Sequence, residues 1–361
     1  MANLMSPVLN NNKIGCTCLQ QIPRLLQTLA IIFAMTIPIC PLIAMVDLDS
    51  LVTDYILEIK QINIPEYPDA FNPSIVRWHG ELLLAFRIRD PETKSTNQIG
   101  FVWLDSDFQP TGSPRLLEFR YKNPLLPAKE QDPRLLVAED TLYIVFNNIV
   151  GPVSEELRRM FVGTVQHEDG CFFVDSLSCM LHFEGATKKM EKNWSPFIWE
   201  NQLLLAYSIH PHRIFRPLDS AMCESFPVAH SNVNWNWGEL RGGTPALMWD
   251  GQYLAFFHSY KNIATVQSGG KIMSHYFMGA YTFSKDPPFA LKHISSQPIV
   301  GDKFYNGPMY KTWKPLRVIF PGGYIFDDQY IWVVYGRQDH ELWVVKLDRT
   351  GLFQNMIPIQ D

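Results

Sequence analysis

The chain has 361 residues, a formal net charge of −5 and a charged fraction of only 19%. It contains no long basic run, which excludes the electrostatic footprint of a nucleic-acid-binding protein, so we expect no nucleic-acid partner. None of the six cysteines is paired at zinc-finger spacing, so we expect no structural zinc. We also expect no other metal site and no bound cofactor.

The first 50 residues differ from the rest of the chain. The run Leu25–Val46 is mostly apolar, Lys13 and Arg24 precede it, and the first acidic residue is Asp47. This pattern is typical of a signal peptide or a membrane anchor. We predict residues 1–50 to be such a segment and expect a secretory, extracytoplasmic or membrane-anchored protein; an apolar or disordered extension is the alternative.

The remaining residues, 51–361, contain a recurring phrase. A small or polar residue precedes Pro, and an apolar strand follows about eight to twelve residues later. The copies begin at Asn72-Pro73, Asp132-Pro133, Ser195-Pro196, Thr244-Pro245 and, more loosely, Phe320-Pro321. The strands that they introduce are Glu81–Arg87, Thr141–Asn147, Gln202–Ser208, Gln252–His258 and Gln329–Tyr335. Five copies of one unit predict an all-β fold, a five-bladed β-propeller in which equivalent positions converge on one axis.

Between the repeats the chain is typical of strands and turns. The expected hairpin tips are Asp105–Gln109, Glu168–Gly170, Asp250-Gly251 and Asp327-Asp328. Outside the leader, only Ser154–Met160 resembles a helix. Cys171 and Cys179 flank an apparent turn, so that a cross-strand disulfide and two free thiols are both open.

Asp132 is the first candidate for chemistry. It occupies the repeat position that holds Asn72 in the first copy and Ser195 in the third. An aspartate before proline usually makes a turn hydrogen bond. The repeat register instead favours a carboxyl that points at the propeller axis, where an enclosed acid could keep or donate a proton near neutral pH.

Basic residues recur where the repeat strands start and end. They are Arg87 and Arg89, Arg134, Lys192, Arg241, His258 and Arg337. Singly, each is more typical of a solvated charge or a structural salt bridge. Together, a ring of cations around one acid suits an anionic ligand such as phosphate. His210-Pro211-His212 could contribute to a metal site, but no third ligand is placed by the sequence.

Five short phrases in order resemble glycoside hydrolase family 130, whose members are β-mannoside phosphorylases, β-mannosidases and related β-1,2-mannosyltransferases on a five-bladed propeller. The phrases are Asp132-Pro133-Arg134, Lys192-Asn193-Trp194-Ser195-Pro196, Tyr207-Ser208-Ile209-His210-Pro211-His212, Gly242-Gly243-Thr244-Pro245 and Tyr335-Gly336-Arg337-Gln338-Asp339. The resemblance runs from about residue 70 to residue 347.

The resemblance implies a role for each matching residue. Asp132 matches the catalytic acid, which delivers its proton to the glycosidic oxygen. The residues matched to sugar or pocket positions are Asn72, Ser74, Arg134, His212, Thr244 and Asp339. Those near phosphate-holding positions are Arg87, Lys192 and His258. The implied partners are an oligosaccharide or glycoside and, as co-substrate, inorganic phosphate or a sugar 1-phosphate.

Three positions depart from the usual phosphorylase pattern and predict a divergent branch: Gln131 before the acid, Arg337-Gln338 in the last phrase, and Arg241. Inverting cleavage needs an acid on one face of the bond and a nucleophile on the other. The cations favour phosphorolysis, or transfer from mannose 1-phosphate, because they can hold an anionic nucleophile. A hydrolytic β-mannosidase and a sugar-binding propeller without catalysis are the alternatives; the oligomeric state is open.

Overall fold

The computed structural model describes residues 45–89, 97–120, 129–151, 157–184, 188, 190–219, 221–312 and 314–360. Of the predicted leader run Leu25–Val46, only its last two residues belong to this part of the chain. Within the described ranges, no helix is both long enough and apolar enough to cross a membrane. The compact unit that holds the described residues extends from Ile43 to Asp361.

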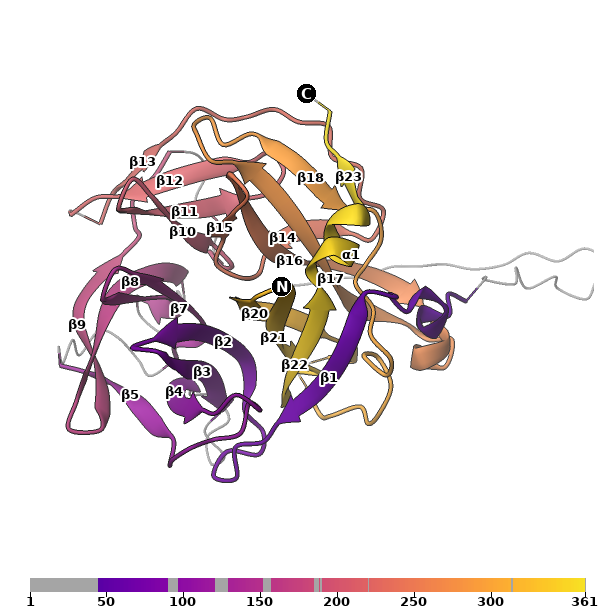
Figure 1. The fold of residues 1–361 in the computed structure, drawn as a ribbon, viewed down its shortest axis with the longest axis horizontal. Helices are drawn as coiled ribbons and strands as arrows, with labels where there is room; N and C mark the ends of the chain where they lie inside the picture. The colour runs from indigo at the N-terminus through magenta and orange to yellow at the C-terminus, as the bar shows by residue number, and fades with distance from the viewer. Residues whose placement is uncertain are drawn as a thin grey trace, which may run out of the picture. The chain divides into compact units, whose positions relative to one another are not determined.

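The described strands form five blades around an axis, which confirms the predicted all-β propeller (Figure 1). Blade 1 consists of β2 (Phe71–Trp78), β3 (Glu81–Arg89), β4 (Asn97–Leu104) and β5 (Arg115–Phe119). Blade 2 consists of β6 (Gln131–Ala138), β7 (Thr141–Val150), β8 (Leu157–Glu168) and β9 (Cys171–Cys179). Blade 3 consists of β10 (Ser195–Trp199), β11 (Gln202–Ser208), β12 (Arg213–Pro217) and β13 (Cys223–Ser225).

Blades 4 and 5 contain the two ends of the described chain. Blade 4 consists of β14 (Glu239–Gly242), β15 (Leu247–Trp249), β16 (Gln252–Ala264), β17 (Ile272–Ser284), β18 (Leu291–Ser295), β19 (Leu316–Arg317) and the C-terminal β23 (Met356–Pro358). Blade 5 consists of β20 (Ile319–Asp327), β21 (Tyr330–Arg337), β22 (Glu341–Asp348) and the N-terminal β1 (Ile56–Ile62). Short helices flank these blades: η1 (Leu48–Leu51), η3 (Val266–Ser268) and α1 (Arg349–Gln354).

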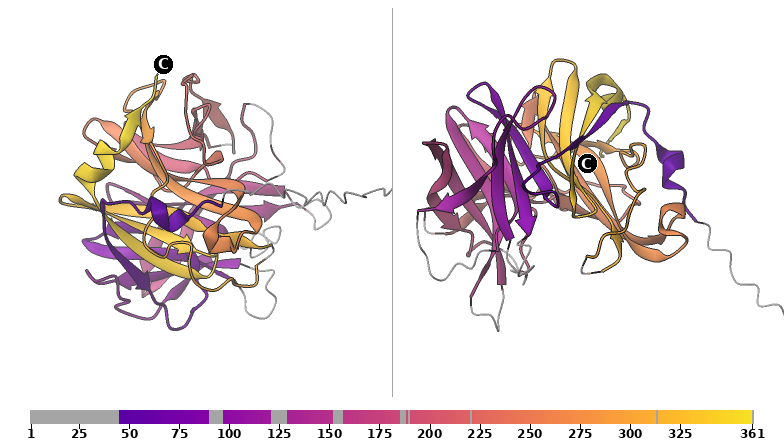
Figure 2. Two further views of the ribbon diagram at one scale, coloured as in Figure 1. Left: turned by 90° about the vertical axis from the view of Figure 1, so that its right-hand side faces the viewer. Right: turned by 90° about the horizontal axis from the view of Figure 1, so that it is seen from below.

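The hydrophobic core is divided among the blade interfaces. Each interface between successive blades holds one apolar cluster, and a fifth cluster joins blade 5 to blade 1. Blades 1 and 2 are also linked at their outer edges, where β5 pairs with β9 in parallel. The side views in Figure 2 show the blades side by side around the ring. Burial between blades, rather than one central core, therefore holds the ring closed.

The hairpin register locates the equivalent residues of the first three repeats. Ser74, Arg134 and Ser195 each lie four residues before the last paired residue of their inner strand. The residues two positions earlier are therefore equivalent, and they are Asn72, Asp132 and Asn193. All three have left-handed backbone angles, with φ of 50°, 57° and 64°. The sequence register was thus wrong in the third repeat, where Asn193 and not Ser195 matches Asp132.

Two glycines allow the inner segments of blades 4 and 5 to approach the backbones of neighbouring blades. A Cβ on Gly242 would lie 2.1 Å from the carbonyl oxygen of Asn193. A Cβ on Gly322 would lie 2.0 Å from the carbonyl oxygen of Pro73. Both glycines allow a close approach of backbones that no other residue would permit.

The expected hairpin tips are all turns, but the predicted helix and the apparent turn between Cys171 and Cys179 were wrong. Leu157–Met160 was expected to be helical and is the start of β8. Cys171 and Cys179 lie at the two ends of β9, roughly 25 Å apart at the rise of a strand, and both are free thiols. A disulfide would need Cα atoms within about 7 Å of each other.

The propeller unit includes residues that precede position 51. Val46 forms a parallel bridge with Thr265, and Leu48 is fully buried in the cluster between blades 4 and 5. The amide of Leu48 donates to Gln267 Oε1 at 3.1 Å, and Gln267 Nε2 donates to Asp47 Oδ1 at 2.8 Å. The segment at 46–50 is therefore part of the folded unit.

We predict that Leu48→Ala lowers the free energy of unfolding by about 2–5 kcal/mol, because it leaves a cavity in a closed interface. Val52→Ala, at a position that is 47% exposed, is the matched control and should change it by less than about 0.5 kcal/mol. Chemical denaturation measures both. Equal, small effects would mean that this segment does not contribute to the propeller.

Candidate active site

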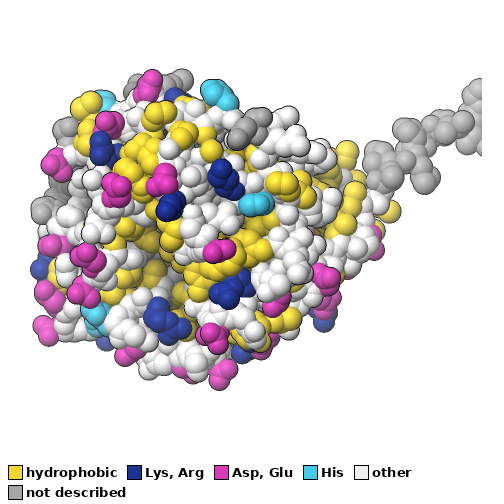
Figure 3. All heavy atoms as spheres, turned by 45° about the horizontal axis from the view of Figure 1, so that its top comes forward, with side chains coloured by type: hydrophobic (Ala, Val, Ile, Leu, Met, Phe, Trp, Pro, Cys, Tyr) yellow, Lys and Arg dark blue, Asp and Glu magenta, His cyan; other side chains and the backbone are white. Residues whose placement is uncertain are grey.

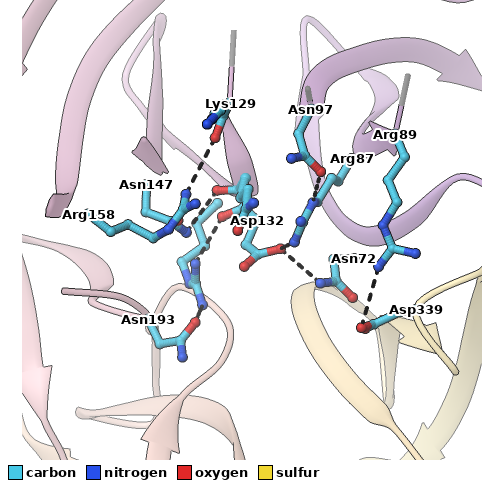
Figure 4. A network of polar contacts seen from close by, with 12 residues as sticks. Asn72, Arg87, Arg89, Asn97, Lys129, Asp132, Asn147, Arg158, Asn193 and Asp339 are labelled. Atoms are coloured by element: carbon cyan, nitrogen blue, oxygen red, sulfur yellow. Dashed lines mark hydrogen bonds and ion pairs between the residues drawn. The ribbon is translucent and has the colours of Figure 1, made fainter. Parts of the chain in front are cut away.

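Asp132 lies where the starts of the inner strands meet the end of β3 (Figure 4). Its side chain is buried, and its Oδ1 accepts hydrogen bonds from Asn72 Nδ2 at 2.8 Å and from Arg87 Nη1 at 3.0 Å. These three residues come from β6, β2 and β3. The left-handed bulge at the start of each inner strand directs Asn72 and Asp132 toward each other, so the repeat geometry builds this contact.

Basic groups dominate the electrostatics of Asp132. Burial alone would raise the pKa of its carboxyl, but Arg87 and Lys192, followed by the Asn72 hydrogen bond and Arg134, outweigh burial and hold that pKa well below its usual range. The carboxylate is therefore ionised in the unliganded protein. It can hold a proton at neutral pH only if these basic groups are engaged elsewhere.

A second carboxylate, Asp339, belongs to the same network (Figure 4). It lies in the turn between β21 and β22, and its Oδ2 is 3.7 Å from Arg89 Nη2. Burial raises the pKa of Asp339, and the nearby charge of Asp132 adds to this, while Arg87 and Arg89 oppose it. The two carboxylates consequently have pKa values displaced in opposite directions in the unliganded protein.

The two arginines at the end of β3 pack against the same aromatic side chain. Arg87 and Arg89 lie over the ring of Phe71, at 4.7 and 4.5 Å from its centroid. Arg87 Nε also donates to Asn97 Oδ1 at 2.8 Å. Alternation along the strand places both guanidinium groups on one face, so each can meet one carboxylate.

Lys192 and Arg158 add positive charge near Asp132. Burial lowers the pKa of Lys192 to about 8, with Asp132 opposing and Arg158 reinforcing the shift, so most of its ammonium groups stay charged at neutral pH. Arg158 Nη1 donates to Asn147 Oδ1 at 2.8 Å, and Asn147 Nδ2 donates to the carbonyl of Gln131 at 3.1 Å. Figure 4 shows Arg158 and Asn193 across Asp132 from Arg87 and Arg89.

Arg134 is fully buried and joins three repeats. Its Nη1 donates to the carbonyl of Asp132 at 2.9 Å, its Nε to the carbonyl of Gly243 at 2.6 Å, and its Nη2 to Asn193 Oδ1 at 3.1 Å. A buried guanidinium with protein acceptors positions the strands around it. The expected sugar contact is thus replaced by a positioning role.

Three other predicted site residues also make structural contacts. Ser74 Oγ accepts from the amide of Leu135 at 2.9 Å. Thr244 Oγ1 donates to the carbonyl of Pro245 at 2.8 Å and accepts from the amide of Phe256 at 3.0 Å. His212 lies between blades 3 and 4 among Tyr281 and Phe283, with Nδ1 2.7 Å from the carbonyl oxygen of Phe289.

His258 is near the network but carries no positive charge. It lies against the rings of Phe320 and Tyr276, with centroids 4.7 and 5.8 Å away. Burial, with Arg241 and Arg134, lowers its pKa to about 3. Its Nδ1 is buried, and a neutral imidazole does not attract an anion by charge.

The sequence did not identify Arg158, Asn193 or Glu130. Arg158 was missed because its segment was predicted to be a helix and is the start of β8. Asn193 was missed because the third repeat was aligned on Ser195. Glu130 directly precedes β6 and is 7% exposed. Its Oε1 accepts a hydrogen bond from Asn148 Nδ2 at 3.4 Å. Burial raises its pKa to about 7. Only its place beside Gln131-Asp132 could have pointed to it.

Metal ligation finds no support in this network. Among the residues that the structure describes, no three His, Cys, Asp or Glu side chains are grouped so that they could hold an ion.

Figure 3 shows acidic and basic side chains mixed over one face of the molecule, with apolar side chains between them. The concentration of basic groups around Asp132 is therefore a local feature of the site.

Comparison with known proteins identifies the fold. No protein-family profile and no curated protein matches the sequence. Among solved structures, a β-1,2-mannobiose phosphorylase from Listeria innocua aligns at a TM-score of 0.55 and 14% identity, over 82% of this chain and 92% of that one. A mannose phosphorylase from Leishmania mexicana, in complex with a phosphate ion, aligns at 0.54 and 12%, over 85% and 92%.

A third similar structure comes from the GH130 family of mannoside phosphorylases, which contains glycoside hydrolases that target β-1,2-mannosidic linkages in Candida mannan. It aligns at a TM-score of 0.53 and 12% identity, over 78% of this chain and 85% of that one. At these identities the likeness is one of fold. The chain is thus a five-bladed propeller of the architecture that these mannoside-active proteins share.

We predict that Glu130→Gln stabilises the protein above neutral pH. The folded-state pKa of Glu130 is raised above its unfolded value, so its contribution to stability is greatest below about pH 4.5 and is lost as the pH rises through 7. Removing the charge should therefore raise the free energy of unfolding by about 1–3 kcal/mol at pH 8 and change it little at pH 4. Denaturation of both proteins at the two pH values measures this; a pH-independent difference would contradict the prediction.

Proposed function

We propose that this protein is a carbohydrate-active enzyme that cleaves or forms β-mannosidic bonds with inversion, using Asp132 as general acid and phosphate, or mannose 1-phosphate in the reverse direction, as co-substrate. One observation carries the proposal: a buried carboxylate at the axis, held by Arg87 and Asn72, with Lys192 close enough to shift its pKa.

The family-like phrases support this proposal. Asp132, Lys192 and Asp339 are far apart in sequence and interact electrostatically in the folded protein. They come from three of the phrases that resemble glycoside hydrolase family 130. Two similar folds are those of a β-1,2-mannobiose phosphorylase and of a mannose phosphorylase with bound phosphate.

The charges around Asp132 suggest how phosphate would prepare the acid. An anion that engages Arg87 and Lys192 takes the stabilising charge away from the carboxylate and adds a negative charge beside it. Both effects raise the pKa of Asp132, so that it takes up a proton from solvent. The anionic nucleophile and the proton would then be present together.

The reaction itself balances with these groups. A phosphate oxygen attacks the anomeric carbon from one face as the bond to the glycosidic oxygen breaks on the other. Asp132 gives its proton to the departing oxygen, directly or through a sugar hydroxyl. The products are an alcohol or shorter glycan and mannose 1-phosphate, and the reverse reaction forms the glycosidic bond.

Hydrolysis is the second candidate, and Asp339 is the observation that favours it. Water must be activated by a carboxylate base on the face opposite the acid. Asp339 is a second, half-buried carboxylate coupled to Asp132, and it makes an ion pair with Arg89. Release of sugar from β-linked manno-oligosaccharides, with and without phosphate, separates the two reactions; sugar binding with no turnover in either condition would indicate a binding protein.

We predict that Asp132→Asn lowers turnover by about 10²–10⁴-fold, because the amide cannot donate a carboxyl proton. Asparagine suits the site conformation, since Asn72 and Asn193 occupy the equivalent left-handed positions. Thermal unfolding should therefore change little and ligand binding should persist. Near-normal turnover would refute the assignment, and lost turnover with a large loss of stability would favour a turn-anchoring role.

We predict that Lys192→Ala raises the KM for phosphate, or for mannose 1-phosphate, by about 10- to 100-fold, because a charge-assisted hydrogen bond contributes roughly 1.5–3 kcal/mol. Lys303→Ala is the matched control, since that side chain is 75% exposed. Initial rates over a range of phosphate concentrations measure the effect. An unchanged phosphate dependence in both variants would make Lys192 structural and favour hydrolysis.

A further inference from the structure

Three strongly exposed apolar side chains surround the point where the described chain begins. Met45 is 54% exposed, Val266 is 50% exposed, and Ile272 is 66% exposed, more than any other large apolar side chain in the described part of the protein. We call these three residues the entry patch. They lie beside η1 and the end of the β16–β17 hairpin (Figure 1).

Backbone contacts hold the entry patch together. The amide of Val46 donates to the carbonyl of Ala264 at 3.3 Å, and the amide of Val266 donates to the carbonyl of Val46 at 3.0 Å. Ile272 is the residue paired with Ala264 across the hairpin. A Cβ on Gly270 would lie 2.9 Å from Met45 Sδ, so Met45 rests on the hairpin turn.

The apolar run Leu25–Val46 ends inside this patch. Its last two residues, Met45 and Val46, are built into the propeller, so no linker separates the run from the fold. The run is thus covalently continuous with the entry patch through Met45.

Strand direction places the patch on the same side of the propeller as the Asp132 network. β16 starts at Gln252, next to the Asp250-Gly251 turn on the opposite side, and passes His258 before it ends at Ala264. The end of β16 therefore extends about 20 Å beyond His258 at the rise of a strand.

We propose that the entry patch contacts the surface of a lipid bilayer that holds the N-terminal apolar run. Exposed apolar side chains suit the boundary between headgroups and acyl chains. The exposed charges beside them are Lys271, between Val266 and Ile272, and Asp47 and Asp49 at η1. A second copy of the chain is a poorer match, because three side chains supply far less than the about 800 Å² per partner of a stable protein interface. The proposal does not depend on the catalytic function.

Photo-crosslinking of the full-length chain in phosphatidylcholine vesicles, with and without phosphatidylserine, tests the proposal. A benzoylphenylalanine replaces Ile272 in one protein and Met248 in the other. Met248 is the matched control, because it is 48% exposed and lies on β15 of the same blade, beside the opposite turn. Both sites are exposed, so neither replacement endangers folding.

We expect lipid adducts, detected by mass spectrometry, to be at least about 10-fold more abundant from position 272 than from position 248. Equal yields at the two positions would overturn the proposal, as would recovery of the intact chain free of vesicles. A crosslinked protein dimer from position 272 in place of lipid adducts would also overturn it and would assign the patch to a second copy.

Discussion

The buried guanidinium of Arg134 is the interaction on which the axial site depends. A cation without access to water must have its donors satisfied by protein, and those donors reach the carbonyls of Asp132 and Gly243 and the side chain of Asn193. One side chain thus fixes three blades relative to one another at the axis. Burial lowers the pKa of Arg134 only to about 10, so it keeps its charge at neutral pH.

At position 132 the backbone conformation and the charge of the side chain have different causes. The left-handed bulge at the start of an inner strand accepts Asn or Asp readily, and two of its three copies carry Asn. Backbone conformation therefore explains the residue type but not the charge. The carboxylate of Asp132 adds what an amide cannot supply: a partner for Arg87 and a group that can exchange a proton when the surrounding cations are drawn to another anion.

The repeat made the propeller predictable from sequence, because five apolar hairpins at one period have few other ways to bury their faces. The register within the repeat was less accessible. Ser195-Pro196 looks like Asn72-Pro73, but the hairpin pairing and not the proline defines the equivalent position, which belongs to Asn193. Arg134 and Thr244 lie in family-like phrases, yet their hydrogen bonds are to protein, a distinction that only packing reveals.

Errors in the outer strands have a related cause. A run such as Leu157–Met160 has no strict alternation, because both faces of β8 meet neighbouring strands or blades, and it therefore resembles a helix as much as a strand. Cys171 and Cys179 looked like the two sides of a turn because polar residues lie between them. Pairing with β8 instead keeps β9 continuous, with a single bulge that absorbs the irregularity.

Ring closure by β1 sets an order of events during synthesis. β1 is among the first strands to leave the ribosome, yet its partner β22 begins at Glu341, roughly 280 residues after Ile62. At about 5–20 residues per second, the strand stays unpaired for roughly 15–60 s while blades 1 to 4 are made. An early strand with an open edge is a site for wrong pairing. The charged residues of β1, Glu58 and Lys60, protect the strand while it is unpaired, because charges on an open edge discourage association with other chains.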